Sequence, residues 1–326
     1  GAPMMRVTGS LIACTLLETR LLQLVGSGTA VATRAARLVS AAGTAPVYDF
    51  GSRRNSTGEG AVLAARAAYI GGAAASTNAA AALVLGIPAF GTMSDTFLAA
   101  YGDDRLAYDA FQLHFPTIGH YSLPDDDPVD GVTRFGRGRD KVAIVRVDHP
   151  ELARTSRTVR EALDRNGMQG VRILGSGHLD EHRIARLVAA HAPVDSYAVG
   201  RALAPGGEPG MRLAFRIAEM QRGTRLEPLT RQGAALWPGR KQVVRMPDHD
   251  LVCLDTEAPL YTRGGAPLLV PVLRGGRRLA PVEPLDDARG RVARLLESLP
   301  EGYRRLRSPE SWTVRPSDAL AALAIR

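Results

Sequence analysis

The sequence predicts an α/β fold, an irregular parallel barrel-like body followed by a small β-rich domain. Two observations carry this prediction. Between residues 141 and 199, short apolar stretches alternate with amphipathic ones, as in strands joined by crossover helices in a parallel sheet. From about residue 211 the pattern changes to short strands separated by Gly, Pro and Asp turns. We therefore place the barrel-like domain at residues 11–235 and the β-rich domain, with its C-terminal helix, at 236–326. Residues 1–10 belong to this appendage or to a partial N-terminal domain.

Each expected element rests on a local pattern. Apolar residues at three- and four-residue spacing predict helices, and short apolar runs bounded by turn residues predict strands. The expected helices are 11–24, 29–41, 59–70, 77–85, 96–101, 156–166, 180–190 and 285–299. The expected strands are 47–50, 87–90, 141–147, 171–174, 196–199, 243–245, 251–254 and 268–272, the last three antiparallel.

Composition excludes several classes of protein. The 326 residues are 45% hydrophobic and 23% charged, which is ordinary for a globular chain able to bury a full core. Cys14 and Cys253 are too few for a disulfide framework, so a reducing cytoplasm is the default location. No stretch resembles a membrane span or a signal peptide. The net charge of +8 is scattered and aromatic residues are only 5%, so we expect no nucleic-acid partner; a phosphorylated small molecule suits such a field better.

Charged residues follow two of the expected strands, where parallel α/β folds gather their active sites. Arg53 and Arg54 come after the strand 47–50. Arg146 and Asp148 lie at the end of the strand 141–147, and alternation puts them on one face. Paired arginines are equally common in solvated turns, and a structural ion pair would give the same Arg-x-Asp pattern. Each feature alone therefore leaves both interpretations open.

Two successive strand–glycine–helix junctions predict an anion site. Ser176 and Gly177 follow one strand, and Gly200 and Arg201 follow the next. Such junctions present backbone N–H groups to a phosphate, although a single glycine is more often only a turn residue. The sequence has no P-loop, Rossmann, His-Glu-x-x-His or Gly-x-Ser-x-Gly motif, and its seven histidines lack metal spacing. We expect no protein-held zinc or iron.

Seven ordered blocks of sequence resemble the nicotinate phosphoribosyltransferase family. They are 17–37 (LETRLLQLVGSGTAVATRAAR), 49–54 (DFGSRR), 64–78 (AARAAYIGGAAASTN), 86–92 (GIPAFGT), 175–181 (GSGHLDE), 195–200 (DSYAVG) and 238–245 (PGRKQVVR), followed by a similar closing segment. The resemblance implies a type II phosphoribosyltransferase-like barrel that moves ribose 5-phosphate from phosphoribosyl pyrophosphate, with Mg²⁺, to a pyridine nitrogen. It also implies a homodimer with shared active sites.

The resemblance also assigns roles by position. Asp148 would hold the ribose hydroxyls, with Arg146 beside it, and Arg53 would lie near the acceptor and the pyrophosphate. Phe50 would lie beside the acceptor ring. The 5-phosphate would be bound at Ser176, Gly177 and Gly200. The candidate catalytic residues are thus Asp148, Arg146 and Asp95, and the further substrate-binding candidates are Arg54, His149, Glu151 and Arg201.

Three departures from the family pattern affect the expected activity. Asp95 stands where the family has the histidine that is phosphorylated when ATP hydrolysis is coupled, so we expect an ATP-independent enzyme. The family's Asp-Ser-Gly-Asp-Leu is here 148–152, Asp-His-Pro-Glu-Leu, and proline cannot adopt the conformations of glycine. The chain also begins inside the family's pattern. Either this chain is a fragment, or a second polypeptide would supply the N-terminal part, or the acceptor differs.

Aspartates at 125, 126, 127 and 130 favour a changed acceptor. They match aspartates of the family and can be inherited loop structure. With Asp95 and Glu151, however, they would make the mouth of the site acidic, which favours a cationic acceptor such as an aminocyclitol or amino sugar of specialised, antibiotic-type metabolism. Our first interpretation is such a phosphoribosyltransferase. The alternatives are an orthodox nicotinate enzyme of NAD salvage and a non-catalytic paralogue that binds a phosphorylated ligand or a partner subunit.

Overall fold

The computed structural model describes residues 2–135, 142–204, 213–229 and 237–324. Contacts within the chain group it into two compact units, each described by itself below. The first unit consists of Gly1–Leu24, Leu213–Glu283 and Glu301–Arg326, and the second of Val25–Arg212 and Pro284–Pro300. The division that we expected at residue 235 stays a prediction.

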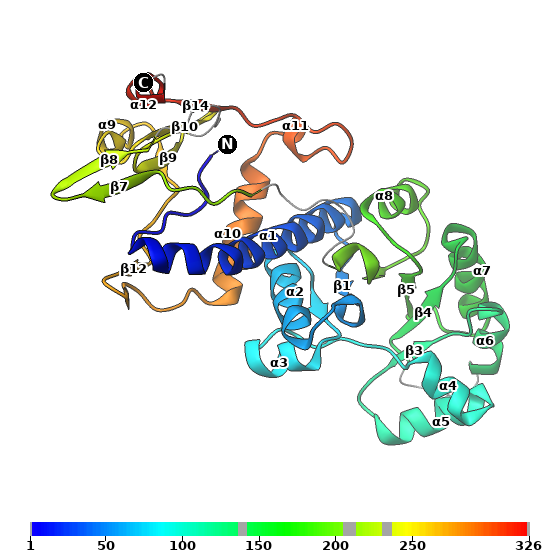
Figure 1. Ribbon diagram of the computed structural model, residues 1–326. Coiled ribbons are helices and arrows are strands. Elements are labelled where there is room, and N and C mark those ends of the chain that lie inside the picture. Colours follow the sequence, from blue (N-terminus) through cyan, green and yellow to red (C-terminus); the bar gives the residue numbers. More distant parts are fainter. Residues whose placement is uncertain (1, 136–141, 205–212, 230–236, 325–326) are drawn as a thin grey trace. The chain divides into compact units, whose positions relative to one another are not determined.

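The second unit is built on a six-stranded parallel sheet with the order β2-β1-β6-β5-β4-β3. Figure 1 labels β1, β3, β4 and β5 of this sheet. Its strands are β1 (Val47–Asp49), β2 (Ala75–Ser76), β3 (His120–Ser122), β4 (Ile144–Asp148), β5 (Arg172–Ser176) and β6 (Ser196–Val199). The parallel α/β architecture expected from the alternating pattern is confirmed. Because all strands run the same way, their carboxyl ends lie along one edge.

The sheet is curled into a half barrel, and the segment 87–93 connects its two edge strands. The N–H of Phe90 donates to the carbonyl of Ser76 in β2 (3.0 Å), and the N–H of Met93 donates to that of His120 in β3 (3.3 Å). The Phe90 ring stacks on Tyr48 of β1 at 3.7 Å between ring centroids and also contacts His120 at 4.7 Å. The Phe90 ring thus contacts side chains of both β1 and β3, on opposite sides of the curled sheet.

The expected strand at 87–90 is wrong. That stretch makes one isolated bridge, between Ser76 and Ala89. Pro88 has no N–H to donate to a ladder, so pairing does not extend beyond that bridge.

Helices surround this sheet, and most begin at a side-chain cap that the sequence supplies. They are α1 (Leu11–Ala42, which starts in the first unit), α2 (Gly58–Ile70), α3 (Ala79–Leu85), α4 (Asp95–Tyr101), α5 (Asp104–His114), α6 (Pro128–Phe135), α7 (Leu152–Arg165), α8 (Glu181–Ala189) and α10 (Leu285–Ser298). The capping side chains, each accepting the N–H three residues on, are Ser10, Thr57, Asn78, Ser94, Asp103, Asp127 and Asp180. Such caps fix where a helix starts, because they satisfy N–H groups with no partner inside the helix.

Helix α1 differs from its expectation. The periodicity predicts two helices, 11–24 and 29–41, whereas the structure has one continuous helix through the glycines at 26 and 28. Its later part is held by burial, since Val31, Ala35 and Leu38 are 1% exposed or less. Tertiary packing outweighs the roughly 1 kcal/mol that each glycine costs in a helix.

The first unit is a small β-rich body, as expected. Its sheet has the order β11-β9-β10-β14, and Val243, Val252 and Leu320 form its buried core. The strands of this unit are β7 (Glu219–Arg222), β8 (Arg225–Pro228), β9 (Lys241–Arg245), β10 (Asp250–Leu254), β11 (Ala266–Pro267), β12 (Leu273–Arg274), β13 (Arg277–Arg278) and β14 (Val314–Pro316), and its short helices are α9 (Ala258–Tyr261), α11 (Glu301–Arg304) and α12 (Asp318–Ala324). Strand β14 pairs with β10 in parallel, so this sheet is mixed.

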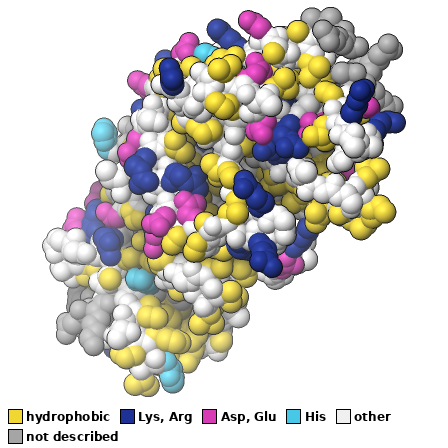
Figure 2. All heavy atoms as spheres, turned by 90° about the vertical axis from the view of Figure 1, so that its left-hand side faces the viewer, with side chains coloured by type: hydrophobic (Ala, Val, Ile, Leu, Met, Phe, Trp, Pro, Cys, Tyr) yellow, Lys and Arg dark blue, Asp and Glu magenta, His cyan; other side chains and the backbone are white. Residues whose placement is uncertain are grey.

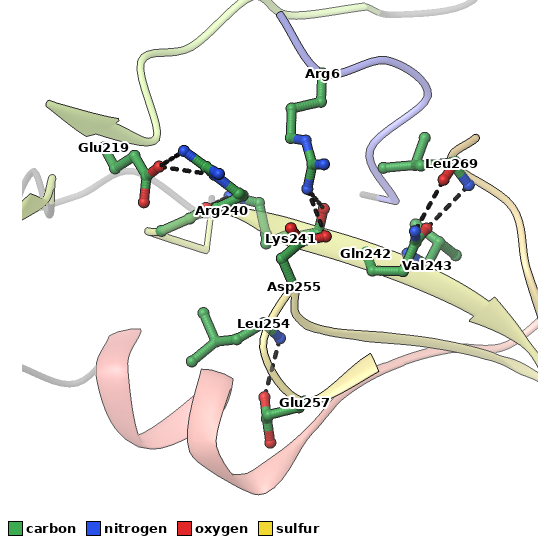
Figure 3. Close-up of polar contacts among 11 residues, drawn as sticks. Arg6, Glu219, Arg240, Lys241, Gln242, Val243, Leu254, Asp255, Glu257 and Leu269 are labelled. Carbon is green, nitrogen blue, oxygen red and sulfur yellow. Dashed lines mark hydrogen bonds and ion pairs between the residues drawn. The ribbon is translucent and has the colours of Figure 1, made fainter. Parts of the chain in front are cut away.

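The expected strand at 268–272 is replaced by side-chain bonding (Figure 3). Strand β11 ends at Pro267. The N–H of Leu268 still donates to the carbonyl of Val243 (2.8 Å), and at Leu269 the side chain of Gln242 takes over the pairing. Its Nε2 donates to the carbonyl of Leu269 (2.8 Å) and its Oε1 accepts the N–H of Leu269 (2.9 Å). Nearby, Arg6 forms an ion pair with Asp255 at 2.7 Å (Figure 3).

The surface charges agree with the scattered pattern of the sequence. Figure 2 shows basic and acidic side chains interspersed with apolar ones over one face. Within the described residues, no helix is long and apolar enough to cross a membrane.

Candidate active site

A hydrogen-bonded network joins the carboxyl ends of β4 and β5. Arg146 donates from Nη2 to Asp148 Oδ2 (2.6 Å) and from Nε to Ser176 Oγ (2.9 Å). The Ser176 hydroxyl, which thereby accepts, donates in turn to Asp148 Oδ2 (2.7 Å). The register pairs Asp148 with Ser176, which places these side chains on one face of the sheet. The network fixes the Asp148 carboxylate while leaving its other oxygen, Oδ1, without a hydrogen bond inside the network.

Gly177 packs directly behind this carboxylate. Its φ is +100°, and a Cβ there would lie 2.8 Å from Asp148 Oδ1 and 3.2 Å from the His149 nitrogen. Only glycine fits this position, because a side chain would be strained and would also push against the carboxylate. The turns after β4 and β5 therefore touch at backbone distance.

Backbone N–H groups at the ends of β5 and β6 are available to a ligand. Within the described part of the chain, the N–H groups of Gly177, His178, Leu179 and Gly200 donate no hydrogen bond. β5 and β6 are neighbours in the sheet. Amides at two adjacent strand ends, one of them beside the N-terminus of α8, suit a phosphate.

Two buried groups shape the loop after β1. Asp49 accepts the N–H of Gly51 at Oδ1 (2.8 Å) and the hydroxyl of Ser76 at Oδ2 (2.7 Å), and burial raises the pKa of this carboxyl above its usual range. The same loop packs on β6, since a Cβ at Gly200 would lie 3.2 Å from the Phe50 carbonyl oxygen. The structure thus brings Phe50 and Gly200 together.

This loop carries cations and unpaired polar atoms. Arg53 and Arg54 form a 3₁₀ turn (Ser52–Arg54) with exposed side chains, and neither makes an ion pair within the described residues. Ser52 Oγ and Asn55 Oδ1 are buried and have no hydrogen-bond partner among those residues either. Buried polar atoms without partners are costly, so their presence here fits a loop that receives a polar ligand.

Carboxylates gather around Arg146. Asp95, at the start of α4, lies 3.5 Å from Arg146 Nη1 and is 62% exposed. The pKa of Asp125 is raised, first by burial and then by the negative charges of Asp148 and Asp95. The negative charges of Asp95, Asp125 and Asp148 together would attract a cation. The described residues hold no group of three or more side chains suited to bind a metal ion by themselves.

His149 directly follows Asp148 and has a defined tautomer. Its Nδ1 accepts the N–H of Glu151 (3.0 Å) and lies 3.0 Å from Thr155 Oγ1. Because a backbone N–H can only donate, Nδ1 carries no proton and the neutral ring is protonated at Nε2. The ring is therefore a hydrogen-bond donor at its free nitrogen.

Two expected residues lie apart from these contacts. Glu151 pairs only loosely with Arg154, at 3.6 Å on the surface, although its N–H holds His149. Arg201 is exposed and makes no ion pair within the described residues. Three residues that the sequence did not single out prove central to the turns: Asp49 and Ser76, described above, and Arg183 on α8. For Asp49 the sequence offers one indication of such a role, its position immediately before the Phe-Gly-Ser-Arg-Arg turn. For the other two residues it offers none.

Comparison with known proteins gives consistent results. Residues 264–324 match the family model described as "Nicotinate phosphoribosyltransferase C-terminal domain". The nicotinate phosphoribosyltransferase pncB2 of Mycobacterium tuberculosis is 34% identical, over 98% of this chain and 70% of that protein. The same organism's pncB1 is 36% identical, over 92% of this chain and 69% of that protein.

Solved structures show the same fold. The nicotinate-nucleotide pyrophosphorylase of Pyrococcus furiosus has a TM-score of 0.74 at 27% identity, covering 86% of this chain and 73% of that one. The human nicotinic acid phosphoribosyltransferase has a TM-score of 0.75 at 23% identity, covering 97% and 77%. The second likeness, at its lower identity, speaks for the fold alone.

Proposed function

Because the chain belongs to the nicotinate phosphoribosyltransferase family, and is thus an enzyme of the phosphoribosyltransferase class, we propose that it joins nicotinate to ribose 5-phosphate for NAD salvage. In this reaction the pyridine nitrogen forms a bond to C1 of the ribose. The bond from C1 to the pyrophosphate oxygen breaks, and pyrophosphate leaves with the electron pair. The observation that carries the proposal is the Arg146–Asp148–Ser176 network beside unoccupied backbone amides.

The network suits the donor sugar. Asp148 is held by Arg146 and Ser176, so its remaining oxygen can accept hydrogen bonds from the ribose hydroxyls without reorganising. The N–H groups of Gly177 and Gly200 would bind the 5-phosphate. Holding both ends of the sugar restricts C1 to a position where an acceptor can attack.

The loop after β1 suits the leaving group and the acceptor. Arg53 and Arg54 offer two cations to pyrophosphate or to a carboxylate, and the unpartnered Ser52 Oγ and Asn55 Oδ1 lie in the same loop. The Phe50 ring borders this loop and packs with Phe90 at 6.3 Å between centroids. An aromatic ring beside cations suits a flat, negatively charged acceptor such as nicotinate.

Magnesium fits the acidic side of the network. Asp95 and Asp125 are close enough for their charges to interact, and they would hold a hydrated Mg²⁺ that arrives on the pyrophosphate. The ion would neutralise charge that develops on the leaving group. The donor is negatively charged, and these carboxylates would repel it. The positive charge of Arg146, which lies beside Asp95 and Asp148, would offset that repulsion.

The acceptor is where the proposal departs from our first interpretation of the sequence. That interpretation favoured a cationic acceptor, whereas the curated relatives favour nicotinate. The carboxylates of Asp95 and Asp125 give the cationic acceptor its remaining support, so it is the competing arm of the test. Independence from ATP, argued from Asp95 in place of histidine, stays part of the proposal, as does the homodimer.

The test is a pyrophosphate-release assay with phosphoribosyl pyrophosphate and Mg²⁺. We expect release with nicotinate and the same rate whether or not ATP is present. Release only with amines or aminocyclitols would establish the changed acceptor. Donor binding by calorimetry without release on any acceptor would instead indicate a non-catalytic paralogue.

A further inference from the structure

Arg183, in the first turn of α8, joins the two turns that carry the site. Its Nη1 donates to the carbonyl of Gly177 (2.6 Å), and its Nη2 donates to the carbonyls of His149 (3.1 Å) and Pro150. The first carbonyl belongs to the turn after β5 and the other two to the turn after β4. One guanidinium thus holds together the backbone on both sides of Asp148.

This arrangement needs arginine. The rigid, planar guanidinium presents several donors at fixed angles, whereas the lysine ammonium is a compact charge on a flexible stem. Within the described residues Arg183 makes no ion pair, and all three of its acceptors are neutral carbonyls. Its positive charge is therefore not cancelled locally and remains available to a nearby anion.

The contact also fixes a peptide plane. In a planar trans peptide, the carbonyl and the following N–H point in opposite directions. The carbonyl of Gly177 points to Arg183, so the N–H of His178 points away from it. That N–H has no acceptor within the described part of the chain. The peptide between Gly177 and His178 lies in a turn, where φ at Gly177 is +100°. Its orientation is therefore not fixed by the hydrogen bonds of a regular helix or strand.

We propose that Arg183 is a positioning residue: by tying the turn after β5 to the turn after β4, it aims the His178 amide at the donor's 5-phosphate. Neither the sequence patterns nor the family resemblance assigns it a role. The inference rests on the proposed function, because it concerns how the same site binds its donor.

The test compares two arginines that make the same kind of contact. Arg157 of α7 donates to the carbonyls of His191 (3.4 Å) and Ala190 beyond the far end of α8. Arg157→Gln therefore removes an arginine–carbonyl contact between α7 and the segment after α8 without touching the site. The variants to compare with it are Arg183→Gln and Arg183→Lys. The first loses both the planar set of guanidinium donors and the positive charge, and the second keeps only the charge.

Calorimetry with phosphoribosyl pyrophosphate and with inorganic phosphate gives the first readout. We expect Arg183→Gln to weaken the binding of both ligands by about tenfold or more, and Arg183→Lys to recover only part of that affinity. Steady-state assays should show a raised KM for the donor with the KM for the acceptor unchanged. Millimolar guanidinium chloride should restore donor binding to Arg183→Gln, and Arg157→Gln should bind like the wild type.

Three other outcomes separate failure of this inference from failure of the proposed function. If the wild type binds donor and Arg183→Gln binds it equally well, the positioning role is wrong while the proposed function stands. Equal losses in Arg157→Gln and Arg183→Gln, each matching its loss of folding stability, would make the contact merely structural and would also overturn the inference. Absence of donor binding by the wild type would refute the proposed function itself.

Discussion

Replacing Gly177 by alanine is the sharpest test of the site geometry. The new Cβ meets two obstacles, a φ of +100° and contacts of 2.8 Å to Asp148 Oδ1 and 3.2 Å to the His149 nitrogen. The conformational cost is about 1–2 kcal/mol, and overpacking against a backbone that cannot withdraw adds about 1–3 kcal/mol. Asp148 can move only by leaving its bonds to Arg146 and Ser176. We therefore expect a loss of about 2–5 kcal/mol in the free energy of unfolding, and turnover lowered roughly a hundredfold.

The assay pairs urea denaturation with pyrophosphate release, and Gly167→Ala is its control. Gly167, two residues after α7, has a φ of +74° and no atom within 4 Å of an added Cβ. That variant pays the conformational cost alone, so it should lose about 1 kcal/mol of stability and keep its activity. If Gly177→Ala behaved like Gly167→Ala in both measurements, the packing of Gly177 against the carboxylate would have no functional meaning.

Three further predictions follow from groups described above or from the thiols. Asp148→Asn should lower kcat about a hundredfold and weaken the calorimetric Kd for phosphoribosyl pyrophosphate far less, and near-wild-type turnover would remove its role at the ribose. Burial raises the pKa of Asp49 in the folded state, so its ionisation opposes folding: the stability of the wild type relative to Asp49→Asn should be greatest below about pH 4 and decline as pH rises through the folded pKa. Parallel stability curves in urea titrations would contradict this. Burial raises the pKa of the Cys253 thiol to about 11, so a thiol reagent at pH 7.5 should label Cys14 in the native protein and Cys253 only in denaturant; rapid labelling of both would show that the core around β10 opens.

The sequence predicted best what local pattern controls. Strands β4, β5 and β6 were expected because buried apolar runs alternate with amphipathic helices there, and Arg146 and Asp148 share a face because strand side chains alternate. Helix α5 was missed although Asp103 caps it and Tyr108 and Phe111 are buried. The signal for this helix is present in the sequence, since Ala107, Tyr108 and Phe111 stand at three- and four-residue spacing after the Asp103 cap.

Features set by distant contacts were beyond local sequence patterns. Asp95 could be grouped with the aspartates at 125–130 only through the family resemblance, because it is the curled sheet that brings α4 near the loop after β3. The role of Arg183 was also not predictable, because its acceptors are backbone carbonyls, which every residue possesses. The strand expected at 268–272 gave way to the Gln242 side chain, a substitution that no periodicity records.

Helix α10 has a consequence for how the protein is made. It follows the β-rich stretch 213–283 in the chain but completes the second unit, where Leu285 packs on the cluster of Ala65, Ala81 and Ile87. Arg289 donates to the carbonyls of Tyr69, Gly72 and Ala73 at the end of α2 and stacks on the Tyr69 ring. A chain emerging from the ribosome therefore exposes this alanine-rich surface until synthesis has passed residue 300. The barrel-like unit, though most of it is translated early, therefore completes its buried surface only after the β-rich stretch has been made.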